Sequence, residues 1–452
     1  MPKPIVTLPL SPLLRCLGNR AFAHLYAAQT INLIGDAFTW LGLGLLAFEL
    51  AGENSALWLS TALTLRVTLF VLLAPIAGVL ADQLDRKGLM VTTHLVRMVL
   101  VSLFPFVSDS WQLYLLVALL SGFHALFTPT YTATLPLITT AEECPAAIAL
   151  SNATYQLLSV LGPALAGSVA ALFNTRSVFF LDALTFLGAA GLIAGLPTAL
   201  LVPREGVVSP HRGFLEELSV GSQCLWWDAA IRYGLLLQLV AAIAGAEILV
   251  NTVGSVQGTL QAGSQAYGSI MAAFGLGATL AAVIWGYFCR RLSAVVAMGL
   301  GGILTVLPLL TADGANVPSL ALLWGIAGMG KTLVNVPMQT MIAERVAVDL
   351  QGHVYGAQFA WSHLWWVLAY PLAGWFGSQF PAQHFFYAGL SGLVLFIAFA
   401  VLSQPWQLQH LPTGFWHSHP HDHDSEHDHH HPHRLQVHPH LHFHTNQPTA
   451  IR

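Results

Sequence analysis

Long apolar segments with few charged residues alternate with short polar connections along most of the chain. A transmembrane helix needs about 20 mostly apolar residues, because it must cross a hydrocarbon layer about 30 Å thick. Twelve segments are long enough, at 22–49, 56–80, 89–107, 112–135, 146–172, 177–197, 233–255, 266–289, 294–312, 318–340, 354–377 and 384–403. The pattern predicts an all-α membrane protein with twelve transmembrane helices.

The longest internal polar segment separates these predicted helices into two groups of six. We therefore expect five regions along the chain. They are a cytoplasmic N-terminus (1–20), an N-terminal six-helix half (21–197), a cytoplasmic connection (198–232), a C-terminal six-helix half (233–403) and a cytoplasmic histidine-rich tail (404–452). Two six-helix halves are the parallel repeat of one large class of secondary transporters.

The composition excludes several classes of protein. Of 452 residues, 55% are apolar and only 8% are charged, whereas soluble domains carry roughly 25% charged residues. The polar segments are too short for a catalytic domain and contain no phosphate loop, HExxH or nucleophile elbow, so no enzyme is expected. The four cysteines lie far apart, and a net charge of -4 argues against a nucleic-acid partner.

Positive charge is distributed unevenly between the two sides of the predicted topology. Most of the 17 Lys and Arg residues lie on the side that carries both termini, and Arg176 is alone in the loops of the other side. Because cytoplasmic loops are enriched in Lys and Arg, both termini are predicted to be cytoplasmic. We expect a multi-pass monomer in the lipid bilayer of the bacterial inner (plasma) membrane.

Two acid–amide pairs lie inside predicted helices. Asn32 and Asp36 are four residues apart in the first helix, and Glu247 and Asn251 are four apart in the seventh, so each pair shares one helical face. An ionisable side chain inside a membrane costs about 2.5–3.5 kcal/mol by insertion scales and is a candidate for function. We predict that Asp36 and Glu247 form a midplane site that binds a divalent ion and protons alternately, with the amides completing the oxygen shell.

The alternative for these acids is structural. Either Asp36 or Glu247 pairs with a buried cation, Arg66, Arg97 or Lys331, and forms a lock between helices.

Other polar residues within the predicted helices are open to two interpretations. His124 and His363 are candidate transient metal ligands, but an isolated histidine in a helix also hydrogen-bonds a neighbouring carbonyl. Lys331 with Asn335 is either a lock or an anion contact. Asp182 is expected to anchor helix packing.

The connection after the second predicted helix contains a recognisable motif. It reads Gly78-Val-Leu-Ala-Asp82-Gln-Leu-Asp85-Arg86-Lys87. This segment resembles the signature between the second and third helices of the major facilitator superfamily, and its Leu-Asp-Arg variant is similar to the drug and siderophore exporter branch. The resemblance implies a conformational latch formed by Gly78, Asp82, Arg86 and Lys87. Positions 83 and 85 depart from the family pattern.

The fifth predicted helix contains a second, weaker likeness. Gly162-Pro163-Ala-Leu-Ala-Gly167 is similar to the kinked glycine–proline motif of antiporters and favours export over import. Small residues and proline are also common packing and kink devices in membrane helices, which is the alternative for this segment.

The C-terminal tail is rich in histidine. Thirteen of the 21 histidines lie in three HxHxHxH blocks, at His417, His419, His421, His423, His427, His429, His430, His431, His433, His438, His440, His442 and His444. Interspersed prolines and acids predict a disordered, extended segment. Alternate residues of an extended chain share a face about 7 Å apart, and imidazole suits nickel, cobalt, zinc and copper ions. We predict a metal-binding tail; an expression tag and a tail without a role are the alternatives.

The latch-like motif and this tail together make the chain resemble the nickel-resistance permeases of the superfamily, of the NreB and NrsD type. The resemblance implies a twelve-helix major-facilitator-type transporter that exports nickel, or cobalt, by proton antiport and confers metal resistance. No permanently bound cofactor is expected, with Ni²⁺, Co²⁺ or Zn²⁺ as substrate and tail ligand. The alternatives are a proton-coupled exporter of organic drugs or siderophores whose tail only buffers metal, and a membrane metal sensor or store.

Overall fold

The computed structural model describes residues 16–140, 142–197, 214–288, 292–404, 414–419 and 438–443. The first group of helices comprises η1 (Cys16–Gly18), α2 (Arg20–Ala51), η2 (Gly52–Asn54), α3 (Ser55–Gln83), α4 (Arg86–Leu103), η3 (Phe104–Phe106), α5 (Ser110–Ile138), α6 (Cys144–Leu172) and α7 (Ser177–Ala194). The second comprises α8 (Phe214–Trp227), α9 (Ala229–Gly254), η5 (Ser255–Thr259), α10 (Gly263–Phe288), α11 (Ala294–Val306), η6 (Leu307–Gly314), α12 (Val317–Arg345), α13 (Val348–Gln379) and α14 (His384–Ser403).

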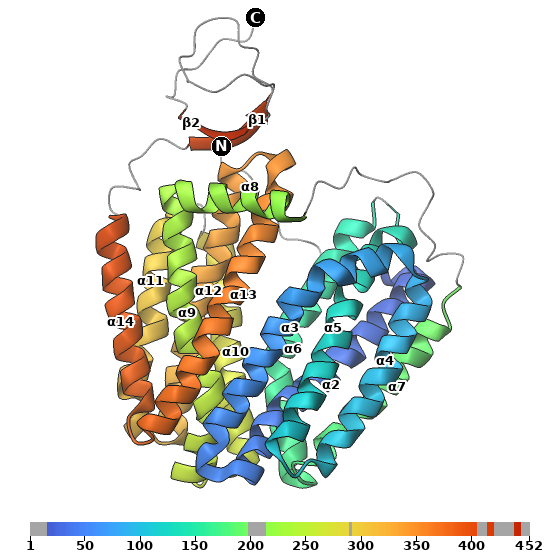
Figure 1. The fold of residues 1–452 in the computed structure, drawn as a ribbon, viewed down its shortest axis with the longest axis vertical. Helices are drawn as coiled ribbons and strands as arrows, with labels where there is room; N and C mark the ends of the chain where they lie inside the picture. Colours follow the sequence, from blue (N-terminus) through green and yellow to red (C-terminus); the bar gives the residue numbers. More distant parts are fainter. Residues whose placement is uncertain are drawn as a thin grey trace, which may run out of the picture.

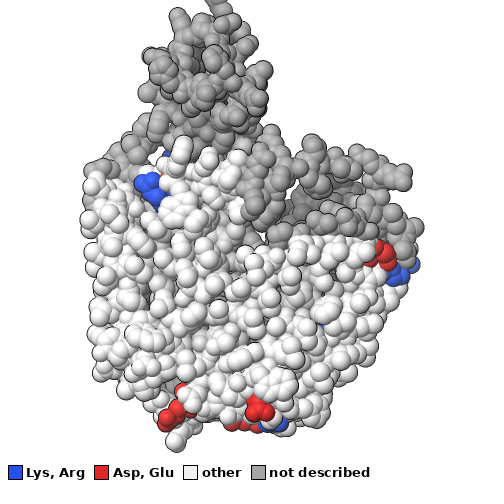
Figure 2. Space-filling view, in the orientation of Figure 1, with Lys and Arg blue, Asp and Glu red and all other residues white. Residues whose placement is uncertain are grey.

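Twelve of these helices, α2–α7 and α9–α14, coincide with the twelve predicted spans, so the predicted twelve-helix fold is confirmed. Among the described residues, nine helical segments are long and apolar enough to cross a membrane, and one of them, Arg20–Leu73, runs through two helices. Charged side chains on the visible described surface gather almost entirely at the two ends of the bundle (Figure 2). The uncharged band between them is the surface expected of a multi-pass membrane protein.

Polar side chains cap the N-termini of several helices at one end of the bundle. The Asn19 amide oxygen accepts hydrogen bonds from two backbone N–H groups at the start of α2, and the Asp228 carboxylate does the same for α9. Asp85, which departs from the family pattern, accepts from the backbone N–H of Gly88 at 2.8 Å and caps α4. Such caps satisfy donors that have no partner within the helix.

The helices form two groups, α2–α7 and α9–α14, which lie side by side (Figure 1). Helix α9 is enclosed by α11, α12, α13 and α14, and most of its residues are buried. Helix α8 lies across one end of the second group, and β1 and β2 lie beyond that end (Figure 1). We call this the α8 end of the bundle.

The two groups touch through small residues near the end remote from α8. A Cβ atom on Gly268 of α10 would lie 2.6 Å from the Pro163 carbonyl oxygen and 2.8 Å from the Gly167 Cα, both in α6. A Cβ on Gly374 of α13 would lie 2.0 Å from the Ser60 Oγ in α3. These positions accept no side chain without moving a helix, so the halves are closed against each other at this end.

The glycine–proline motif contributes to this contact through its last glycine. Gly167 faces α10, whereas Gly162 faces α2, where an added Cβ would lie 2.5 Å from the Ala37 Cβ. The motif therefore packs α6 against one helix of its own half and one of the other half.

Two segments of the tail form strands, β1 (Gly414–His419) and β2 (His438–Phe443), paired antiparallel. These paired strands differ from the prediction of a disordered, extended tail, because an extended backbone can also satisfy its hydrogen-bonding groups against another strand. Eight of the predicted tail ligands lie outside the described residues, namely His421, His423, His427, His429, His430, His431, His433 and His444.

Candidate transport site

Asp36 and Asn32 form a closed network with Arg97 of α4. An Arg97 guanidinium nitrogen donates to the Asp36 carboxylate at 2.6 Å and another donates to the Asn32 amide oxygen at 3.1 Å. The Asn32 amide nitrogen donates to the second Asp36 oxygen at 3.2 Å. The Arg97 side chain is 1% exposed and that of Asp36 is 13% exposed. This is the pairing that the lock interpretation requires, and ion binding by Asp36 stays a prediction.

Asp182 of α7 lies against α2, the helix that carries Asn32 and Asp36. Its carboxylate accepts hydrogen bonds from the hydroxyls of Thr39 and Thr185. A Cβ on Gly35 would lie 2.0 Å from an Asp182 oxygen, so the absence of a side chain there lets α7 approach α2. These contacts are those of a packing anchor.

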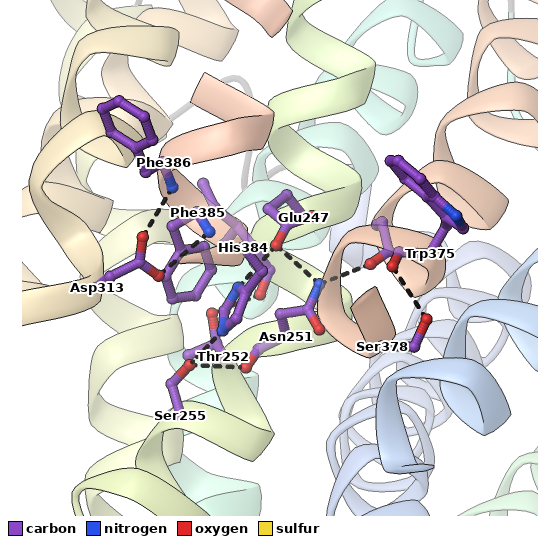
Figure 3. A network of polar contacts seen from close by, with 12 residues as sticks. Glu247, Asn251, Thr252, Ser255, Asp313, Trp375, Ser378, His384, Phe385 and Phe386 are labelled. Atoms are coloured by element: carbon purple, nitrogen blue, oxygen red, sulfur yellow. Dashed lines mark hydrogen bonds and ion pairs between the residues drawn. The ribbon is translucent and has the colours of Figure 1, made fainter. Parts of the chain in front are cut away.

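Glu247 and Asn251 form a second network in the other half (Figure 3). The Asn251 amide nitrogen donates to Glu247 Oε1 at 2.8 Å and to the Ala373 carbonyl of α13 at 2.9 Å. His384 Nδ1 lies 2.9 Å from the same Glu247 oxygen. Glu247 is fully buried, and its other oxygen has no hydrogen-bond partner among the described atoms.

A cavity lies beside this second network. Asp313 of η6 accepts from the backbone N–H groups of Phe385 and Phe386, at 3.2 and 2.8 Å, which fixes the start of α14 (Figure 3). Asp313, Gln383 and Phe386 line a cavity of about 260 Å³. Gln383 and Phe386 flank His384 in the chain, so the cavity lies next to the start of α14, at the end remote from α8.

The structure places the two predicted carboxylates in separate networks. The described contacts of Asp36 are to α2 and α4, and those of Glu247 are to α9 and α14. Among the described residues, no hydrogen bond of either acid joins the two networks, because each acid finds its donors within its own half. The partner of Glu247 also differs from the one that the lock interpretation predicts, because it is His384 and not Arg66, Arg97 or Lys331.

The two predicted histidine ligands approach the same phenylalanine. Phe70 of α3 has its ring centroid 5.9 Å from that of His124 in α5 and 5.7 Å from that of His363 in α13. His363 Nδ1 bonds the Phe359 carbonyl at 2.8 Å, as in the structural alternative. His124 Nδ1 is buried without a partner among the described atoms. Because Phe70 and His363 belong to different halves, this cluster lies at the contact between them.

His384 is the residue that sequence reasoning missed at the Glu247 network. It is separated from Glu247 by 137 positions and stands at the first position of an apolar helix, where no local pattern connects it to an acid. Within the described residues, no three His, Cys, Asp or Glu side chains lie close enough to hold a metal ion.

Two latch residues make backbone contacts within the first half. An Arg86 guanidinium nitrogen donates to the Ala133 carbonyl of α5 at 2.9 Å, and Lys87 Nζ donates to the Leu196 carbonyl at 2.6 Å. Gly78 and Asp82 lie in α3, and the surroundings of these two residues are outside the described part of the structure. The described latch residues therefore tie the start of α4 to α5 and to the segment after α7.

The tail strands place histidine positions opposite one another. The register pairs His417 with His440 and His419 with His438. Directly opposite residues lie on the same face of an antiparallel ladder, so these four positions share one face. His442 pairs with Phe415 in the same ladder.

Comparison with known proteins agrees with this architecture. The Bacillus subtilis (strain 168) protein described as an uncharacterized MFS-type transporter YfiS is 29% identical over 363 residues, which cover 76% of this chain and 84% of that protein. Macrolide efflux protein A of Streptococcus pyogenes is 24% identical over 224 residues, covering 48% of this chain and 53% of that protein.

A solved structure shares the fold. It is that of a bacterial homolog of the human lysosomal transporter Spinster in an inward-facing, unoccupied conformation. The TM-score is 0.67 and the sequences are 14% identical, over 86% of this chain and 97% of that chain. The sequence model of the Major Facilitator Superfamily matches residues 25–246 and 235–420. The twelve-helix bundle and these matches together show that the chain is a transporter of the Major Facilitator Superfamily.

Proposed function

We propose that this transporter exports divalent metal cations, nickel or cobalt, from the cytoplasm in exchange for protons, and so confers metal resistance. The proposal depends on one observation: a chain of this superfamily has a C-terminal tail with regularly spaced histidines. The similarity to a macrolide efflux protein supports export as the direction. Nickel as the preferred ion follows from the resemblance to nickel-resistance permeases, because imidazole alone binds copper(II) more tightly.

The tail is proposed to collect metal on the cytoplasmic side. Histidine has an ordinary pKa of about 6.5 and is mostly neutral at cytoplasmic pH, so its ring nitrogens are free to bind metal. The register of β1 and β2 puts four histidine positions on one face, which favours several ligands around one ion. A tethered site raises the local ion concentration near the bundle without being part of the transport path.

The α8 end is proposed to face the cytoplasm of the bacterial inner membrane. Arg86, Lys87, Arg232 and Arg345 lie at that end, in agreement with the positive-inside rule. The halves are closed at the other end by the Gly268 contact. This conformation then faces inward, as the solved homolog of Spinster does, and the tail lies on the side from which cargo enters.

Proton exchange is assigned to the buried acid–amide networks. Glu247 has a buried oxygen without a partner, a histidine within hydrogen-bond distance and a nearby cavity toward the outer end. A charged carboxylate is costly there, so binding a proton competes with binding a cation. Asp36 and Asn32 are proposed to alternate between Arg97 and cargo, and His124 and His363 to act as transient ligands.

Uptake by everted membrane vesicles tests the function. Vesicles with the full-length protein receive radioactive nickel, cobalt or zinc, with and without an imposed proton gradient. Gradient-dependent nickel uptake is expected, and Glu247→Gln should abolish it, whereas exposed Arg176→Gln at the other surface should not. Vesicles that contain intact protein and accumulate no ion under any gradient would refute metal export.

A second candidate function is proton-coupled export of organic drugs or siderophores, with a tail that only buffers metal. The aromatic cluster around Phe70 and the macrolide efflux relative favour it. Deletion of the gene distinguishes the two: broad drug sensitivity with unchanged nickel tolerance would favour organic cargo.

A further inference from the structure

A second cavity lies inside the C-terminal half. It has a volume of about 130 Å³ and is lined by Gln238, Ala241, Ala242, Lys331, Asn335, Ser362 and Trp366, from helices α9, α12 and α13. Ser362 is adjacent in the chain to His363, which contacts Phe70 of the other half. The cavity is therefore next to the contact between the halves, where a transporter of this repeat type is expected to bind cargo.

Lys331 gives this cavity a positive charge. Its ammonium lies 4.8 Å from the ring centroid of Trp366 and 5.6 Å from that of Phe274. Within the described residues the ammonium has these ring contacts and no carboxylate within ion-pair distance. A cation inside the membrane is costly without a counter-charge, and cation–π contacts are worth only about 0.5–2 kcal/mol. Lys331 is thus a cation that faces a cavity and has no counter-charge in the described part of the chain.

Three acids of the described helices have hydrogen-bond partners of their own. Asp36 pairs with Arg97, Asp182 with two threonine hydroxyls, and Glu247 with Asn251 and His384. None of the described residues that line the cavity is an acid, so this lining offers no carboxylate to neutralise Lys331 or to bind a bare divalent cation.

Amide groups complete the polar lining. The Gln238 amide nitrogen donates to the Asn335 oxygen at 2.9 Å, and the Gln238 oxygen is buried without a partner among the described atoms. The Ser362 hydroxyl adds a further polar group to the wall. A carboxylic acid or carboxylate with a neighbouring hydroxyl matches this set, because it accepts from the ammonium and donates to the free amide oxygen.

We propose that this cavity binds the carboxylate of an organic anion through Lys331. This inference rests on the proposed function, because the cargo is still the exported metal. The metal crosses as a complex with a hydroxycarboxylate and not as a bare ion. The ligand's carboxylate occupies the cavity, and the metal that it carries lies toward His363.

Binding of citrate alone tests the anion site. Isothermal calorimetry uses full-length protein in lipid nanodiscs, with citrate as the probe and no metal present. Lys331→Gln should weaken citrate binding by about 10-fold to 100-fold, the range expected for a lost charge-assisted hydrogen bond. Lys331→Arg should retain most of the affinity, and Arg176→Gln, which removes a surface charge, should match wild type. Equal citrate affinity in wild type and Lys331→Gln would overturn the inference.

Nickel transport separates this inference from the proposed function. Everted vesicles receive nickel with and without an equimolar amount of citrate, and citrate should raise uptake in wild type but not in Lys331→Gln. Uptake of nickel that is independent of citrate and of Lys331 would overturn the complexed cargo while leaving metal export intact. Citrate binding that depends on Lys331, with no nickel uptake in either form, would support the anion site and refute metal export.

Discussion

The contact between Gly268 and α6 predicts a specific effect of a single methyl group. Gly268→Ala would place a Cβ 2.6 Å from the Pro163 carbonyl oxygen and 2.8 Å from the Gly167 Cα. Ordinary contacts begin near 3.4 Å, so α10 and α6 must separate by about 0.8 Å, or the closed arrangement is lost. Both neighbouring atoms are backbone, and no side chain can rotate away to relieve the contact.

The size of the effect follows from the cost of overpacking. Inserting a methyl group into a packed contact typically costs 1–3 kcal/mol. Because this contact joins the two halves, the cost falls on the conformation closed at the end remote from α8 and not on the open one. A cost of about 2 kcal/mol shifts the ratio of closed to open molecules by roughly 30-fold.

Distances between spin labels measure this shift. Labels at Leu172 and Gln265, on exposed ends of α6 and α10, should give a short, narrow distance distribution in wild type and a longer one in Gly268→Ala. Gly188→Ala is the matched control, because an added Cβ there meets nothing within 4 Å. Identical distributions in Gly268→Ala and wild type would show that this contact does not hold the halves closed.

Three further predictions concern the charged networks and the tail. Asp36→Asn should destabilise the protein by about 3 kcal/mol, since it leaves buried Arg97 without a carboxylate. Thermal unfolding in detergent measures this loss. If adding Arg97→Gln to Asp36→Asn recovers no stability, the pairing is contradicted. Glu247→Gln should abolish proton-driven uptake in vesicles while exchange of cargo down its own gradient persists, and His384→Gln should reduce coupling in the same direction. Truncation at Trp416 should lower metal resistance at low external metal but not at saturating metal, and equal growth at all concentrations would leave the tail without a collecting role.

Part of the candidate site could be predicted from the sequence. Acid and amide residues four apart, as in Asn32–Asp36 and Glu247–Asn251, share a helical face, and both pairs are hydrogen-bonded in the structure. The partners of these acids on other helices did not follow from the sequence. Arg97 was one of three candidate cations for Asp36, and His384 was not a candidate for Glu247. Spacing along one helix is a local property, whereas partners on other helices depend on how those helices rotate and pack.

The sequence by itself determined the class of fold. The sequence shows twelve apolar segments, a polar division in the middle and a biased distribution of Lys and Arg. These features predict the fold class because the bilayer selects each apolar segment and its orientation separately. The histidine spacing of the tail is likewise complete in the sequence.

Only the tertiary structure decided how the interior is used. Membrane helices are apolar on faces that meet lipid and on faces that meet protein, so hydropathy does not distinguish them. The structure shows which end of the bundle Gly268 closes and which acids find hydrogen-bond donors within their own half. It also shows that Lys331 faces a cavity without a counter-charge among the described residues. Each of these depends on the approach of helices that are distant in sequence, and that approach is set by packing and not by local composition.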